Sequence, residues 1–261
     1  MDFGIRGRVA LVSGAGGGLG RAMALSLAAE GAVVAVCGRT EAALNETVET
    51  IKAEGGRAMA FVLDLTQPEK FDQVLAGIHQ YLGPVGILVN NSGGPPPSKA
   101  SGVAPETWAM QFATMVSSLI LLTDKVLPDM RSLGWGRIIT STSSGVVTPI
   151  ANLGMSNTLR MALVGWSKTL AGEVASEGIT VNIILPGRIS TKRLGQLDEA
   201  RAGREGISVE DVARKSAATI PLGRYGEPEE YGAVAAFLAS RQASYMTGSV
   251  VRVDGGMIPS V

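Results

Sequence analysis

The chain has 261 residues, an apolar fraction of 46%, and a formal net charge of zero from 23 basic and 23 acidic side chains. The length permits one or two domains, and the apolar content is sufficient for a large core. Because the charge is balanced and no run of like charge occurs, nucleic acid and charged membrane surfaces are unfavourable partners. A small-molecule substrate is expected instead.

The cysteine content and the N-terminus indicate where the protein resides. Cys37 is the only cysteine, which excludes an intramolecular disulfide and fits a reducing compartment. The first residues lack the basic and apolar regions of a secretory signal, and no stretch approaches the ~20 apolar residues that span a bilayer. We therefore expect a cytoplasmic protein without membrane contact. Metal-ligand spacing of His and Cys is absent from the sequence, so no metal site is expected.

Short apolar runs alternate along the whole chain with segments of helical periodicity. Strands are predicted at Arg8–Ser13, Ala32–Cys37, Arg57–Leu63, Val85–Asn90, Arg137–Thr142, Ile179–Leu185 and Ser249–Val253. Helices are predicted at Gly18–Glu30, Glu41–Glu54, Pro68–Leu82, Pro105–Arg131, Asn152–Ser176 and Glu227–Ala239. Continuous apolar runs suit strands that are buried on both faces of a parallel sheet. The alternation predicts one α/β domain over residues 1–261, a Rossmann-like doubly wound seven-stranded parallel sheet with helices on both faces.

The polar stretch at about 188–221 is the one long segment without a predicted element. Irregular segments of this length are usually lids or binding segments, so we interpret it as a substrate loop or lid. Arg188, Lys192 and Arg193 at its start could meet an anionic substrate, or could be solvated without such a role.

A glycine-rich segment, Ser13–Gly20, follows the first predicted strand and opens the first predicted helix. Gly14, Gly18 and Gly20 would permit a tight turn, a close backbone approach to a pyrophosphate, and close packing of the helix on the sheet. The helix N-terminus favours the phosphate charge. This placement predicts a dinucleotide site.

Further motifs follow in order: Asp64-Leu65, Asn90-Asn91-Ser92-Gly93, PGRIST at Pro186–Thr191, and the ending IPLGRYGEPEEYGAVAAFLAS…YMTGSVVRVDGG. With the glycine segment, they resemble the short-chain dehydrogenase/reductase family over essentially the whole chain, in particular its 3-oxoacyl-acyl-carrier-protein reductase-like members. The resemblance implies an NAD(P)-dependent oxidoreductase that transfers a hydride to or from a carbonyl or alcohol. It implies cofactor contacts from Gly14, Gly16, Gly17, Gly18, Leu19, Arg39, Asp64, Leu65, Asn91, Gly93, Ile189 and Thr191.

Arg39, at the end of the second predicted strand, bears on the choice of cofactor. An acidic residue there would bind the ribose 2′-hydroxyl of NAD(H), whereas arginine accommodates a 2′-phosphate. Against this, Gly17 stands where NADP-preferring relatives often have a basic residue. NADP(H) is favoured, and NAD(H) remains possible.

The proton-transfer residues of the family are largely replaced. In the family, tyrosine exchanges the substrate proton, lysine lowers the tyrosine pKa and binds the nicotinamide ribose, serine positions substrate, and asparagine completes a relay. Ser156, Arg160, Ser143 and Met115, respectively, stand at the matching positions, so only Ser143 agrees. Ser156 is a poor acid or base at neutral pH. Arg160 keeps a positive charge one helical turn away but cannot readily lose a proton.

Three interpretations of this site remain open. Hydride transfer could survive with Ser143, Ser156 and Arg160 as the catalytic residues and with a proton from water or substrate. The pocket could instead perform non-redox chemistry, or be a catalytically degenerate nucleotide-binding site. Tyr225, in the region of the substrate loop, could swing in and is the backup acid. The resemblance also implies a homotetramer, which would cover apolar faces of the helices Pro105–Arg131 and Asn152–Ser176.

Overall fold

The protein is built on one sheet of seven parallel strands. In the computed structural model, which describes residues 2–260, the strand order is β3-β2-β1-β4-β5-β6-β7. The strands are β1 (Val9–Val12), β2 (Val33–Gly38), β3 (Arg57–Val62), β4 (Val85–Asn90), β5 (Gly136–Ser141), β6 (Ile179–Pro186) and β7 (Val250–Val253). All neighbouring strands pair in parallel. The strand order reverses beside β1, where α/β sheets of this kind bind ligands.

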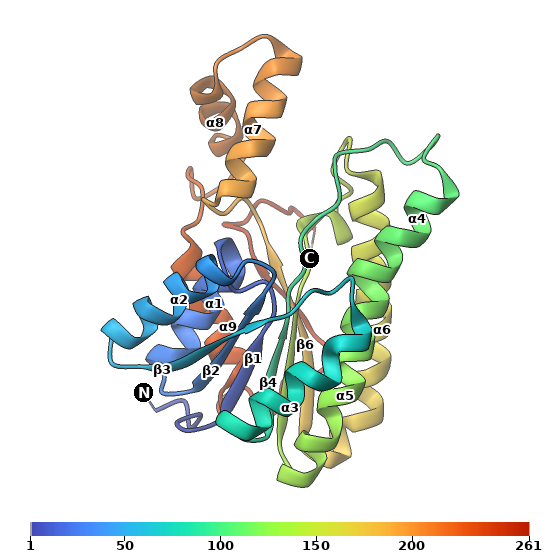
Figure 1. Ribbon diagram of the computed structural model, residues 1–261. Coiled ribbons are helices and arrows are strands. Elements are labelled where there is room, and N and C mark those ends of the chain that lie inside the picture. The colour runs from blue at the N-terminus through green and yellow to red at the C-terminus, as the bar shows by residue number, and fades with distance from the viewer. Residues whose placement is uncertain (1, 261) are drawn as a thin grey trace.

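Helices cover both faces of the sheet (Figure 1). One layer consists of α1 (Gly18–Ala29), α2 (Glu41–Ala53) and α9 (Pro228–Ala239), and the other of α3 (Phe71–Tyr81), α5 (Ser118–Leu133) and α6 (Gly154–Val174). Alternate strand residues enter the two cores: Ala10 and Val12 join the first, while Val9 and Leu11 join the second. The predicted doubly wound fold is therefore confirmed.

The predicted helix Pro105–Arg131 is continuous but not regular. It consists of α4 (Pro105–Phe112), a π-helical turn η2 (Ala113–Ser117) and α5. Pro105–Leu133 is long and apolar enough, by length and composition alone, to cross a membrane. Leu119 and Leu122 of this helix are fully buried in the protein cores. Packing within the protein therefore accounts for part of the apolar character, while Met110, Phe112 and Leu121 are exposed.

The segment predicted to be irregular contains two helices, which corrects that prediction. They are α7 (Lys192–Glu205) and α8 (Val209–Ala217), and they stand apart from the two helical layers at the top of Figure 1. Thr191 Oγ1 accepts a hydrogen bond from Leu194 N, and Ser208 Oγ accepts one from Asp211 N, so side chains cap both helices. The segment is polar because these helices bury few residues, and not because it lacks regular structure.

A buried tyrosine connects α9 to the carboxyl ends of two strands. Tyr231 is completely buried, its hydroxyl donates to Ile184 O (3.1 Å), and it shares a hydrogen bond with Ser141 Oγ (2.9 Å). Burial raises the pKa of Tyr231, so the hydroxyl stays protonated. This contact fixes the ends of β5 and β6 against α9.

We predict that Tyr231→Phe destabilises the protein by ~1–2 kcal/mol, because it leaves buried polar groups of Ser141 and Ile184 without this partner. Denaturant titration measures the change. Tyr245→Phe is the matched control, since Tyr245 is fully exposed in the chain, and it should change stability by less than ~0.5 kcal/mol. Equal stability of Tyr231→Phe and wild type would contradict this role.

Candidate functional site

The glycine segment forms a tight loop at the N-terminus of α1. Gly14 and Gly18 have φ angles of +65° and +53°, which side chains of L-residues rarely adopt. A Cβ on Gly14 would lie 2.6 Å from Asn91 Nδ2, and a Cβ on Gly20 would collide with Gly14 O. A Cβ on Gly17 would meet nothing within 4 Å, so this part of the loop faces open space. The backbone is therefore accessible where a dinucleotide phosphate would bind.

The rest of the glycine segment attaches the loop to the first layer. A Cβ on Gly16 would lie 3.2 Å from Ala43 Cβ, so Gly16 allows α2 to approach. Leu19 is partly buried against the first core. These two residues position the loop, whereas Gly17 and Gly18 present its open backbone.

Hydrogen bonds join the ends of β1 and β4 at the reversal of strand order. Asn91 N donates to Ser13 Oγ (2.9 Å), and Asn91 Nδ2 donates to Ser13 O (3.2 Å). Thr191 approaches from the other side, with Cγ2 3.8 Å from the position of a Cβ on Gly18. Ile189 is buried and its segment pairs with Gly226. The structure thus brings the glycine loop, the Asn91 motif and the Ile189–Thr191 segment together.

Arg39 and Asp64 form the other end of the expected cofactor site. Arg39 follows β2 directly and is exposed. Thr66 N and Oγ1 donate to Asp64 Oδ1 at 2.9 and 2.8 Å. The pKa of Asp64 is lowered chiefly by the backbone hydrogen bond from Thr66, and the charge of Arg39 acts in the same direction. Leu65 packs against both the α3 side and the α6 side of the second layer.

The chemical end of the site is organised around Arg160 of α6. Its side chain is buried, Nη1 donates to Ser141 O (3.2 Å), and Nη2 donates to Ser92 O (3.3 Å). Arg160 therefore links α6 to the ends of β5 and β4. Burial lowers the pKa of Arg160, and the neighbouring charge of Arg193 lowers it further.

Ser143 and Ser156 lie on the two segments that meet beside Arg160. Ser143 follows β5, and its Oγ accepts a hydrogen bond from Gly145 N (3.1 Å), which fixes the hydroxyl. Ser156 is buried in the first turns of α6, one helical turn before Arg160. The adjacent Asn157 bonds to the backbone of Ile150 and so holds the loop after Ser143 against α6.

Met115 lies in the π-helical turn between α4 and α5 and is almost completely buried. Single π-helical turns often occur at functional sites. The thioether of Met115 cannot donate a proton. The local backbone is therefore distinctive, although the side chain offers no relay.

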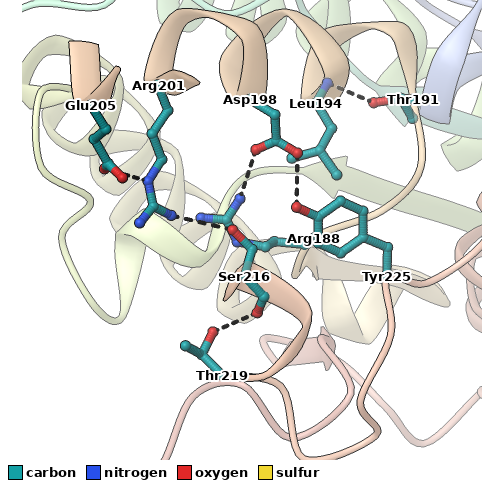
Figure 2. A network of polar contacts seen from close by, with 9 residues as sticks. All are labelled: Arg188, Thr191, Leu194, Asp198, Arg201, Glu205, Ser216, Thr219 and Tyr225. Carbon is teal, nitrogen blue, oxygen red and sulfur yellow. Dashed lines mark hydrogen bonds and ion pairs between the residues drawn. The ribbon is translucent and has the colours of Figure 1, made fainter. Parts of the chain in front are cut away.

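Residues 188–225 are connected by a polar network around Asp198, shown in Figure 2. Asp198 is buried, Oδ1 accepts from Arg188 Nη1 (3.3 Å), and Oδ2 accepts from the Tyr225 hydroxyl (2.8 Å). Burial raises the pKa of Tyr225. Arg201 of the same helix pairs with Glu205 at 2.6 Å. In this structure the Tyr225 hydroxyl therefore donates to Asp198 of α7.

The tyrosine whose hydroxyl reaches the end of β5 is Tyr231, which was not among the residues predicted for the site. It comes from α9, 90 positions after Ser141. Tyr231 is completely buried, so it positions β5 and is not accessible to a ligand. A contact between residues so far apart in the chain leaves no local pattern in the sequence.

Together, the sheet order, the glycine loop and the polar residues at the strand ends define a dinucleotide-binding protein of the Rossmann type. Residues 14–258 match the protein family described as Enoyl-(Acyl carrier protein) reductase. The 3-oxoacyl-[acyl-carrier-protein] reductase FabG of Pseudomonas aeruginosa is 38% identical over 258 residues, which are 98% of this chain and 99% of that protein.

Solved structures agree with this assignment. L-Sorbose reductase from Gluconobacter frateurii, complexed with NADPH and L-sorbose, matches with a TM-score of 0.94 and 33% identity over 100% of both chains. YwfH, an NADPH-dependent reductase involved in bacilysin biosynthesis, matches with a TM-score of 0.92 and 29% identity over 97% of this chain and 99% of that one. Both descriptions name NADPH, in agreement with the cofactor favoured by the sequence.

The chain therefore belongs to the short-chain dehydrogenase/reductase family. The expectation of an NAD(P)-dependent oxidoreductase of this type, similar to 3-oxoacyl-acyl-carrier-protein reductases, is confirmed.

We predict that Asp198→Ala loosens the lid, because it removes the shared partner of Arg188 and Tyr225. Amide hydrogen exchange within residues 192–217 should become about tenfold faster or more, with little change in the sheet. Glu205→Ala is the control on the same helix, since its exposed ion pair contributes little. The same acceleration in both variants would argue against the network.

Proposed function

We propose that this protein transfers a hydride between NADP(H) and a carbonyl or alcohol substrate through an atypical site. Ser143 is retained from the family pattern, and Ser156 and Arg160 stand in place of its tyrosine and lysine. The observation that carries this proposal is the position of Arg160, whose buried guanidinium bridges the end of β5 and the Asn91 motif. Those are the two segments that flank the nicotinamide end of the expected cofactor site.

The cofactor residues proposed from the sequence fit a dinucleotide. The cradle at Gly14 and Gly20 has no space for a Cβ, and the backbone at Gly17 is open. Bound nicotinamide would supply the hydride. Gly14, Gly16, Gly17, Gly18 and Leu19 would hold the phosphates, and Asp64 with Leu65 the adenine. Asn91, Gly93, Ile189 and Thr191 would hold the nicotinamide end, and Arg39 a 2′-phosphate.

In this proposal, Ser143 positions the substrate and Arg160 supplies positive charge. Ser143, with its hydroxyl fixed by Gly145 N, would donate a hydrogen bond to a substrate oxygen. Arg160 would stabilise negative charge that develops on that oxygen, or hold the ribose. Neither Ser156 nor Arg160 readily delivers a proton at neutral pH. We therefore propose that the proton comes from water or from the substrate itself.

A degenerate nucleotide-binding protein, or a non-redox enzyme on the same fold, is the second candidate function. The replacement of the family tyrosine by Ser156, and of the asparagine by Met115, favours it. A missing acid typically costs ~10²–10⁴-fold in rate and leaves positioning intact. We therefore expect slow turnover rather than complete loss of activity.

We also propose a homotetramer in the cytoplasm, with residues 188–221 acting as the lid of the single domain. Apolar side chains on α4, α5 and α6 are exposed in the isolated chain, namely Met110, Phe112, Leu121 and Met161. Contiguous exposed apolar surface favours association between subunits. Copies of the chain that pack through these helices would cover it.

For the cofactor, we predict tighter binding of NADPH than of NADH, because Arg39 is exposed beside the end of β2 and can pair with a 2′-phosphate. Arg39→Ala should weaken NADPH binding about tenfold or more and leave NADH nearly unchanged. Fluorescence titration of both nucleotides measures this. An unchanged NADPH affinity in the variant would remove Arg39 from the site.

For the chemistry, we predict that reduction of an acetoacetyl thioester by NADPH is far slower than the ~10 s⁻¹ typical of enzymes. The combined variant Ser156→Tyr/Arg160→Lys/Met115→Asn should be faster than wild type, because it restores the family relay. Tyr225→Phe is the control for recruitment of a lid acid and should have little effect. Wild-type turnover at ~10 s⁻¹ would contradict the atypical site, and its loss in Tyr225→Phe would identify the acid.

A further inference from the structure

Two arginine side chains approach Gly94 from different elements. Arg160 comes from α6, and Arg193 comes from the first turn of α7. A Cβ on Gly94 would lie 3.6 Å from Arg193 Nη2 and 3.9 Å from Arg160 Nη2. Both nitrogens therefore lie within 4 Å of one point. Arg193 Nη2 also donates to Pro95 O (3.0 Å), which holds it over this loop.

Neither of these arginines has a carboxylate partner within residues 2–260. Arg188 and Arg201, the neighbouring arginines of the lid, are by contrast paired with Asp198 and Glu205. The carboxylate of Asp198 is already engaged by two donors. The positive charge beside Gly94 is thus left without neutralisation by the described part of the chain.

The guanidinium groups also have donors to spare. Each carries five N–H groups, whereas Arg160 donates to two carbonyl oxygens and Arg193 to one. Ser92 Oγ, two positions before Gly94, is buried and has no hydrogen-bond partner among the described residues. The two guanidinium groups that approach Gly94 therefore have N–H groups that the described residues leave unused.

Two like charges at this separation repel each other, and the burial of one of them increases the cost. A bound anion would remove the repulsion and accept the free N–H groups. Planar guanidinium groups match the geometry of carboxylate and phosphate oxygens particularly well. The arrangement is consequently better suited to an anionic ligand than to a neutral one.

We propose that Arg193 and Arg160, with the space over Gly94, bind an oxyanion group of the substrate, so that the protein acts on small organic acids or phosphate esters rather than on neutral ketones. The proposal rests on the reductase function proposed above, because it specifies the substrate class of that same site. Arg193 is the specificity-determining residue, since it comes from α7 and its side chain is exposed.

The test is a calorimetric titration of protein saturated with NADPH, using succinate, succinamide and methyl phosphate at low ionic strength. At least one anion should bind about tenfold more tightly, or tighter still, than the neutral succinamide. The preferred anion then shows whether the site takes a carboxylate or a phosphate group. Equal binding of all three compounds would overturn the proposal. Anion binding only to the cofactor-free protein would also overturn it, because the arginines would then serve the cofactor phosphates.

Variants at Arg193 and at the adjacent Lys192 distinguish a specific contact with the anion from non-specific attraction by surface charge. Arg193→Gln should weaken binding of the preferred anion about tenfold or more, while Arg193→Lys should retain part of it. Lys192→Gln, which removes the same charge from the adjacent exposed residue, should change it less than about twofold. If both variants lost the same amount of anion affinity, the effect would come from the overall positive charge of the surface, and the proposed site would be contradicted.

Gly94→Ala tests the space itself. Its Cβ would make only ordinary van der Waals contacts with both guanidinium groups, and Gly94 does not have a positive φ, so folding should be preserved. The methyl group would occupy the proposed oxyanion position, and anion affinity should fall while NADPH affinity is kept. Undiminished anion binding in this variant would place the ligand elsewhere.

These results are distinguishable from failure of the reductase proposal. Anion binding that depends on Arg193, without turnover of any carbonyl compound, would retain the site and reject reduction. Turnover of neutral ketones without anion binding would retain reduction and reject the site.

Discussion

A buried guanidinium held by two backbone carbonyl oxygens is the interaction on which the chemical end of this molecule depends. Arg160 connects α6 to the end of β5 through Ser141 O and to the end of β4 through Ser92 O. A buried charge is costly unless its donors are satisfied, so these carbonyl oxygens fix the side chain in one place. In the atypical site that we propose, Arg160 supplies a permanent positive charge at the position where the family resemblance places a titratable lysine.

The two halves of the site follow different constraints. The cofactor half is fixed by backbone geometry: Gly14 and Gly20 are required by close contacts that no Cβ could share. The proton-transfer half depends on side-chain identity alone, and α6 keeps its place in the fold with Ser156 and Arg160 present. In our proposal, the chemistry therefore differs from that of the family while the glycine loop for the nucleotide is kept. This separation explains why family membership is clear although the reaction is not fixed by it.

The sequence predicted the sheet because strands buried on both faces must be continuously apolar, and the strand bounds agree to within about two residues. It did not predict α7 and α8, because their exposed, polar surfaces lack the apolar periodicity on which the prediction relied. The contact of Tyr231 with Ser141 and the approach of Arg193 to Arg160 depend on the tertiary fold. Local sequence patterns contain no signal for either.

The crystal structure of the protein with NADPH tests the central claim most directly, because it places Arg160 relative to the nicotinamide end. The account predicts that Arg160 keeps its bonds to Ser141 O and Ser92 O and lies within hydrogen-bond distance of the nicotinamide ribose. No tyrosine hydroxyl should lie beside the reacting face. A structure in which Arg160 does not contact the cofactor, or in which Tyr225 has left Asp198 to face the nicotinamide, would contradict the account.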